Sequence, residues 1–127
     1  MHPETLLLRQ IHPSFVQNGR PTSQAFRPTP KDGNRLSVDD GSKIDARASW
    51  ERFTGTLGFA SVGVLAVTYA ECSEQELPVI ADAKPYPEHC FIDFSGAPKK
   101  AAEKKAKFLA FHAVQRGWLF ADTQQSR

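Results

Sequence analysis

Arginine and hydroxyl side chains gather in the first third of the chain, in segments punctuated by glycine and proline. Guanidinium groups bind carboxylate and phosphate through paired hydrogen bonds. Tight turns such as Asn18-Gly19 would bring these side chains together, so we predict a surface that binds an anion. This N-terminal cluster consists of Arg9, His12, Arg20, Thr22, Ser23 and Arg27, with Ser37 and Asp39 on a following strand. The alternative is that these side chains bind backbone carbonyls and only hold irregular loops together.

A second group of side chains suits proton transfer. Glu71 follows the best candidate for a central strand, and His89 opens a later strand that also carries Asp93. If both meet at one edge of the sheet, Glu71 would orient His89 as a general base near neutral pH. No nucleophile is identified, because Cys72 or Cys90 would serve only if exposed and activated. A purely structural histidine is the competing interpretation.

Lysines crowd the start of the predicted C-terminal helix. They are Lys99, Lys100, Lys104, Lys105 and Lys107, with only Glu103 among them. On a helix this run gives a basic patch that suits a nucleic-acid backbone or an acidic protein partner. The alternative is a solvated outer face, because no aromatic residue alternates with the lysines to stack on bases.

The composition and the missing motifs narrow the field. The 127 residues have a formal net charge of +2, without the strong basic excess of a dedicated nucleic-acid-binding domain. The chain contains no Walker A, GxGxxG, HExxH, GxSxG or EF-hand pattern, which excludes the familiar P-loop hydrolases and zinc proteases. We expect no metal and no cofactor, and we expect Cys72 and Cys90 to be buried free thiols.

Targeting and membrane signals are also not found in the sequence. The first ten residues include Glu4 and Arg9 and lack the apolar core of a signal peptide. The longest apolar stretch, near residues 62–70, is far shorter than a membrane span. We therefore expect a cytoplasmic protein that does not associate with membranes.

The pattern of apolar residues predicts the elements that would position these groups. Strands are expected at residues 5–11, 23–27, 35–39, 61–69, 77–80 and 89–94, and helices at residues 45–57 and 98–116. Asp45 or Ser42 would cap the first helix and Gly117 would end the second. We predict one α+β domain over residues 1–127, with a mainly antiparallel sheet of about five strands, one mid-chain helix and one C-terminal helix. Residues 121–127 are expected to form a frayed tail.

Four sequence elements resemble those of a group of small uncharacterised bacterial proteins. They are Leu8-Arg9-Gln10-Ile11-His12-Pro13, Gly19-Arg20-Pro21-Thr22-Ser23-Gln24-Ala25-Phe26, Leu36-Ser37-Val38 and Pro87-Glu88-His89. They match an Arg-x-Ile-x-Pro element, a Gly-Arg-x-Ser/Thr-Ser-x-Ala-Phe element and a Leu-Ser-Val element, and they span most of the chain. The resemblance implies a bacterial protein but no activity, because the group has no assigned function.

Arg9 and the Ser23-x-x-Phe26 element are also similar to the arrangement in ADP-ribosyltransferase-type folds. This likeness implies an enzyme acting on a nucleotide or an NAD-like substrate, with Glu71 as acid or base and His89 in the pocket.

Three functions therefore remain open. The first is a small non-enzymatic binding or accessory protein of a larger bacterial system, which holds an anionic ligand or a protein partner through the N-terminal cluster. The second is the NAD-type enzyme. The third is a nucleic-acid-binding protein that uses the lysine-rich helix.

Overall fold

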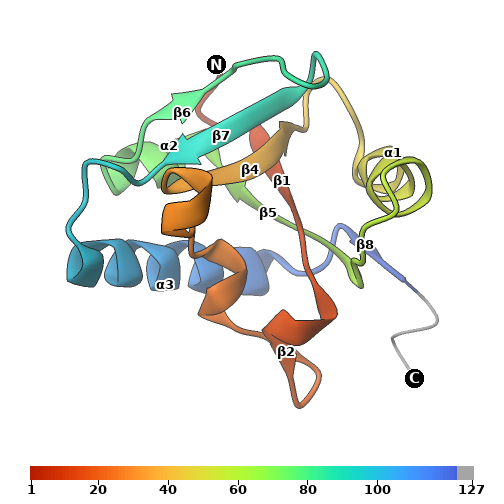
Figure 1. Cartoon of the computed structure of the whole chain (residues 1–127), viewed down its shortest axis with the longest axis horizontal. Helices are drawn as coiled ribbons and strands as arrows, with labels where there is room; N and C mark the ends of the chain where they lie inside the picture. The colour runs from red at the N-terminus through yellow and green to blue at the C-terminus, as the bar shows by residue number, and fades with distance from the viewer. Residues whose placement is uncertain (123–127) are drawn as a thin grey trace.

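The computed structural model, which describes residues 1–122, is built around one antiparallel sheet (Figure 1). Six strands follow each other in the order β6-β7-β4-β1-β5-β8, and every neighbouring pair is antiparallel. They are β1 (Leu6–Gln10), β4 (Arg35–Asp40), β5 (Gly63–Thr68), β6 (Val79–Ile80), β7 (His89–Asp93) and β8 (Phe120–Ala121). A separate hairpin joins β2 (Val16–Gln17) to β3 (Arg20–Pro21).

Helices cover both faces of this sheet (Figure 1). The longest is α3 (Lys99–Arg116), which packs on one face together with the short 3-10 helix η2 (Ser23–Phe26). On the other face lies α1 (Ala46–Glu51), which continues as the single π-helical turn η4 (Arg52–Thr56). The remaining helices are α2 (Tyr69–Glu74), η1 (Pro13–Phe15) and η3 (Pro30–Asp32). No helix within residues 1–122 is long and apolar enough to cross a membrane.

Alternation along β1 divides the apolar residues between two cores. Leu7 and Ile11 are fully buried in the larger core, which lies between the sheet and α3. Leu8 points to the opposite face, where it joins a smaller core with Val64 and Ala66 beneath α1. Successive side chains of a strand point to opposite faces, so this one strand anchors both helical layers.

Local signals account for where several elements begin and turn. Of the two predicted capping residues, Asp45 caps α1, and its carboxylate accepts a hydrogen bond from the Ala48 N–H at 2.8 Å. Asn18 and Gly19 form the turn of the small hairpin with positive φ angles of 52° and 77°, a conformation that Asn-Gly pairs favour.

The predicted α+β class and the antiparallel sheet are confirmed, but the numbers of elements were wrong. Over residues 1–122 the sheet has six strands rather than about five, and there are three α-helices rather than two. Residues 23–27 are not a strand, because residues 23–26 form η2 and bury Ala25 and Phe26 against the α3 side of the core. Residues 120–121 form an edge strand although residues 121–127 were expected to fray, and residues 123–127 lie outside the described part of the chain.

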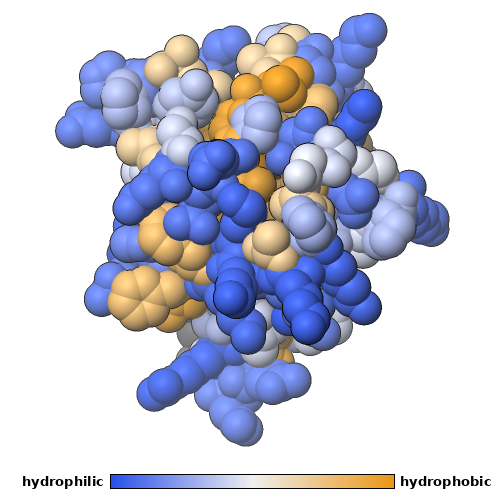
Figure 2. All heavy atoms as spheres, turned by 90° about the vertical axis from the view of Figure 1, so that its left-hand side faces the viewer, coloured by the Kyte–Doolittle hydropathy of each residue, from blue (hydrophilic) through white to orange (hydrophobic). Residues whose placement is uncertain are grey.

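The surface at the end where α3 begins is largely hydrophilic, with separate hydrophobic patches (Figure 2). Among residues 1–122 the exposed large apolar side chains include Phe59, Phe111 and Val114. Phe111 and Val114 lie on the same helix, one turn apart, and so form one patch.

Gly63 lies where β5 meets the segment that leads into β8. A Cβ atom at this position would lie 2.5 Å from the Phe120 carbonyl oxygen and 2.9 Å from the Trp118 ring. We expect Gly63→Ala to lower the free energy of unfolding by about 2 kcal/mol, because backbone and ring would both have to move. Gly55→Ala is the control, because no atom lies within 4 Å of its Cβ position. Urea unfolding measures the stability of both variants. Equal free energies of unfolding would contradict the close packing at Gly63.

Candidate functional site

Two adjoining cavities lie where β1 and β4 part, the first of them on the face of the sheet that carries α1. The first encloses about 200 Å³ between β1, β4, β7 and the α1–η4 helix. Its apolar lining comes from Leu8, Val38, Phe53, Leu57, Pro85 and Tyr86, and we name it the apolar chamber. The second encloses about 440 Å³, and we name it the polar chamber. Its charged and titratable lining comes from Arg9, Arg27, Asp32, Arg35, Asp82 and His89. Because Arg9, Ser37 and His89 line both cavities, the two chambers lie side by side and share a wall.

Arg9 stands where the sheet opens between the two chambers. β1 pairs with β4 only at Leu7 and Leu8, and beyond that point the Arg9 side chain binds both flanking segments. Its Nε donates to the Ala25 carbonyl at 2.8 Å and its Nη1 donates to the Ser37 carbonyl at 3.1 Å. The Arg9 guanidinium therefore bridges backbone segments, as the alternative interpretation of the N-terminal cluster expects.

Burial also changes the titration of Arg9. Loss of hydration lowers the pKa of this guanidinium to about 10, while the nearby negative charge of Asp32 opposes the shift. The side chain remains protonated at neutral pH, and it contributes a positive charge to the wall shared by both chambers.

A continuous chain of hydrogen bonds lines the apolar chamber from β1 to η4. Ser61 Oγ donates to Gln10 Oε1 at 2.9 Å, and Gln10 Nε2 donates to Ser49 Oγ at 2.9 Å. Ser49 Oγ donates to Asp39 Oδ2 at 2.7 Å, and the same carboxylate oxygen accepts from Arg52 Nη2 at 3.2 Å. These polar groups are satisfied by one another, so they fix the helix over the sheet rather than offering free contacts.

Arg52 closes the outer end of the apolar chamber. Its guanidinium forms ion pairs with Asp39 and Glu88, and it lies 4.0 Å from the centre of the Tyr86 ring. The ion-paired side chains are only 15% to 18% exposed. Such shielded charge pairs and cation–π contacts are stronger than exposed ones, so the Tyr86 loop is held against η4.

His89 faces both chambers and has a carboxylate partner. Its Nδ1 lies 2.7 Å from Asp82 Oδ1. Burial alone would raise the pKa of Asp82, but the hydrogen bond and charge of His89, with backbone N–H groups, hold the pKa below its usual range. Asp82 therefore orients His89 as an ionised carboxylate, which is the arrangement required for proton transfer.

The predicted N-terminal cluster does not form one surface. Arg9 and Arg27 line the polar chamber. Ser23 lines a shallow hollow beside α3, on the opposite face of the sheet. Arg20 is exposed on β3 of the small hairpin, and His12 caps η1 by accepting from the Ser14 N–H at 3.0 Å.

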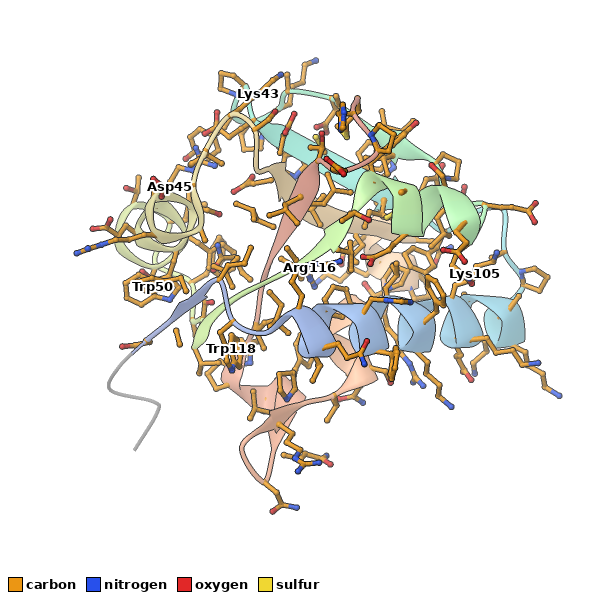
Figure 3. All side chains as sticks on the ribbon, turned by 180° about the vertical axis from the view of Figure 1, so that it is seen from behind. Lys43, Asp45, Trp50, Lys105, Arg116 and Trp118 are labelled. Carbon is orange, nitrogen blue, oxygen red and sulfur yellow. The ribbon has the colours of Figure 1, made fainter. Side chains whose placement is uncertain are left out.

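Glu71 and His89 do not form the predicted pair. Glu71 completes a capping box with Thr68 at the start of α2 and forms an ion pair with Arg116 at 2.7 Å. Arg116 is the last residue of α3 (Figure 3). His89 is paired with Asp82 instead. Glu71 follows β5 and His89 begins β7, and β4 and β1 lie between these two strands. At ordinary strand spacing, β5 and β7 are therefore about 14 Å apart.

The two cysteines are free and buried, as predicted. Burial raises the pKa of Cys72 to about 12 and that of Cys90 to about 11, and nearby carboxylates add to both shifts. Neither thiol therefore has the exposure or the thiolate character of a nucleophile. Within residues 1–122, no three His, Cys, Asp or Glu side chains group closely enough to hold a metal ion.

The lysine run lies far from the chambers, along α3. Four of its members, Lys99, Lys100, Lys104 and Lys107, are exposed. Lys105 differs, because its Nζ donates to the Gln75 carbonyl at the end of α2. One predicted patch residue therefore joins two helices, while the others are available to solvent.

The sequence alone did not identify Asp82, Arg35, Arg52 or Tyr86 as parts of the site. Arg35 and Asp39 alternate with buried Leu36 and Val38 along β4, and this period could have placed both on the chamber face. Asp82 gives no such signal, because it lies in the irregular segment before β7.

Comparison of the chain with protein-family models, with curated proteins and with solved structures finds no match. The resemblances to small bacterial proteins and to ADP-ribosyltransferase-type folds therefore stay predictions.

The Glu71–Arg116 pair predicts a pH-dependent stability. Burial would raise the pKa of Glu71, but the hydrogen bonds of Arg116 and Thr68 lower it below its usual range. A carboxylate with a lowered pKa stabilises the fold above the unfolded value of about 4.3, and the contribution disappears as the pH falls. We expect Glu71→Gln to cost about 1 kcal/mol at pH 7, because glutamine keeps the capping box but loses the ion pair.

Urea unfolding at pH 7 and below pH 4 measures this dependence. The difference between the native chain and Glu71→Gln should shrink at the lower pH. The control is Glu74→Gln, an exposed change on the same helix, for which we expect less than about 0.5 kcal/mol at either pH. A Glu71→Gln effect that does not change with pH would contradict the assigned ion pair.

Proposed function

We propose that this protein is a small non-enzymatic binding protein whose two chambers hold one anionic ligand with an apolar part. The observation that carries the proposal is Arg27. Its Nε is buried without a hydrogen-bond partner within residues 1–122, and the residue lines the polar chamber. A buried charged donor without a partner costs about 1–3 kcal/mol, and a bound carboxylate or phosphate would remove this cost.

The charge balance of the polar chamber supports an anion. Arg9, Arg27 and Arg35 contribute three positive charges, whereas Asp32 and Asp82 contribute two negative charges. Asp82 is engaged by His89, and Asp32 accepts a hydrogen bond from Thr29 at 2.8 Å. The excess positive charge can be neutralised by one ligand group, and guanidinium forks suit carboxylate and phosphate.

The apolar chamber supports a ligand that is more than an inorganic ion. It adjoins the polar chamber through His89, and the rings of Phe53 and Tyr86 are part of its wall. The two cavities enclose about 200 Å³ and about 440 Å³, the scale of small-molecule sites. We propose a ligand with a planar or branched apolar group of a few carbons joined to a carboxylate or phosphate.

One observation favours an enzyme as the second candidate. The Asp82–His89 pair stands at the junction of the chambers, where a general base would reach a bound ligand. The NAD-type arrangement needs Arg9 and Ser23 in one pocket with Glu71 or His89. Arg9 and His89 share the chambers, but Ser23 lines the hollow beside α3. The geometry therefore favours binding without chemistry. A role within a larger bacterial system is part of the proposal and follows from the resemblance alone.

Calorimetry with phenyl phosphate, benzoate and their neutral analogues tests this proposal. We expect the anionic compounds to bind and Arg27→Gln to weaken binding roughly tenfold or more, because a charge-assisted hydrogen bond is lost. Arg27→Lys should recover only part of the affinity, because lysine lacks the planar fork. A saturating ligand should also raise the melting temperature by several degrees.

Arg20→Gln provides the matched control. It removes the same charge from an exposed position on the small hairpin, and we expect it to leave the affinity unchanged. Equal effects of Arg20→Gln and Arg27→Gln, or no binding of any anion by the folded protein, would overturn the proposal. Circular dichroism of each variant separates a lost contact from a lost fold.

A further inference from the structure

A straight line of exposed side chains runs along α3, on the face turned away from the sheet. Lys100, Lys104, Lys107, Phe111 and Val114 follow at helical spacings of three and four residues, so they lie on one face. The first three are exposed lysines. The other two are apolar, with Phe111 59% and Val114 43% exposed. We name this line the α3 stripe, and its character changes from basic to apolar along the helix.

A shallow hollow of about 300 Å³ lies at the apolar end of the stripe. Pro21 and Ser23 of the neighbouring hairpin and η2 form one wall, while Phe111 and Val114 form the other. Lys107 lines the same hollow, so an apolar contact and a positive charge lie side by side. This pairing suits a partner segment with an apolar side chain next to a carboxylate.

The basic end of the stripe carries an excess of positive charge. Within residues 1–122, none of Lys100, Lys104 and Lys107 forms an ion pair. Glu103 is the only acidic residue on α3, so the helix contributes excess positive charge at this end. Complementary charge from a partner would steer its approach and fix its orientation along the stripe.

We infer that the α3 stripe binds an acidic peptide segment of a partner protein, with an apolar side chain of that segment in the hollow beside Phe111. The stripe is separate from the chambers, because α3 and η4 lie on opposite faces of the sheet. The inference is therefore independent of the proposed anion site.

A single-stranded nucleic acid fits the stripe less well. Stacking of successive bases requires several exposed rings along a basic groove, but Phe111 is the one aromatic residue of the stripe. The Trp118 ring packs near the Gly63 backbone, where an added Cβ would lie 2.9 Å from it. The formal net charge of +2 also lacks the strong basic excess of such proteins.

Selection from a displayed library of random twelve-residue peptides tests the inference on the full chain. We expect enriched peptides to combine a run of Asp or Glu with one Leu, Ile or Phe. Fluorescence anisotropy of a synthetic enriched peptide then gives its affinity for each variant. Phe111→Ser and the double variant Lys104→Glu/Lys107→Glu should each weaken binding about tenfold or more, because one removes the apolar anchor and the other reverses the charge.

The matched control is Lys31→Glu/Lys43→Glu, which makes the same charge change at exposed positions outside α3. An equal loss in this control, or enrichment of peptides without the acidic and apolar pattern, would overturn the inference. It would also be overturned if labelled oligo(dT) bound instead, with a steep salt dependence and sensitivity to the α3 variants. Arg27→Gln should leave peptide affinity unchanged, so failure of the anion site is distinguishable from failure of the stripe.

Discussion

The guanidinium of Arg9 decides where the sheet opens. Two strands that pair at Leu7 and Leu8 would ordinarily continue their ladder, yet β1 and β4 part there, and a charged side chain enters between them. The desolvation of this charge is costly, and it is offset by two hydrogen bonds to carbonyls of separate segments, those of Ala25 and Ser37. Both chambers exist beside this opening, so the site depends on a structural arginine.

A second constraint acts at the other end of the site. The hydrogen-bonded chain from Ser61 to Arg52 links β1, α1, β4 and η4 in series. Each member depends on its neighbour, because a buried polar group without a partner is costly. Arg52 also contacts the ring of Tyr86, and so connects this chain of hydrogen bonds to the segment before β7. The walls of the apolar chamber are consequently held by contacts among polar side chains that line it beside the apolar ones.

The elements that the sequence predicted well are those whose signal is local. The continuous apolar residues of β5 predict a strand, and the proline before α3 and the glycine after it predict the ends of that helix. Neither signal depends on contacts with other elements. η2 was mistaken for a strand, because burial of Phe26 against α3 is a tertiary contact that no short window contains. At α2 a local signal was present but was not used. Thr68 and Glu71 form a capping box at the end of an apolar strand, and this box starts the helix.

The site was harder to predict than the fold for the same reason. Guanidinium chemistry drew attention to Arg9 and Arg27, but only the sheet order places them with His89 rather than with Ser23. Glu71 and His89 lie at the same end of the sheet, but two strands, β1 and β4, separate them. Residue type therefore indicated the chemistry, whereas strand order decided which groups can act together.

The short helix η2 connects the two surfaces that the proposals concern. Its first residue, Ser23, lines the hollow beside α3, and Arg27, which follows its last residue, lines the polar chamber. Between them, Ala25 and Phe26 are fully buried, and the Ala25 carbonyl accepts from Arg9. A closely packed turn holds its residues in fixed positions. The fixed position of η2 therefore sets the geometry of one wall of each surface.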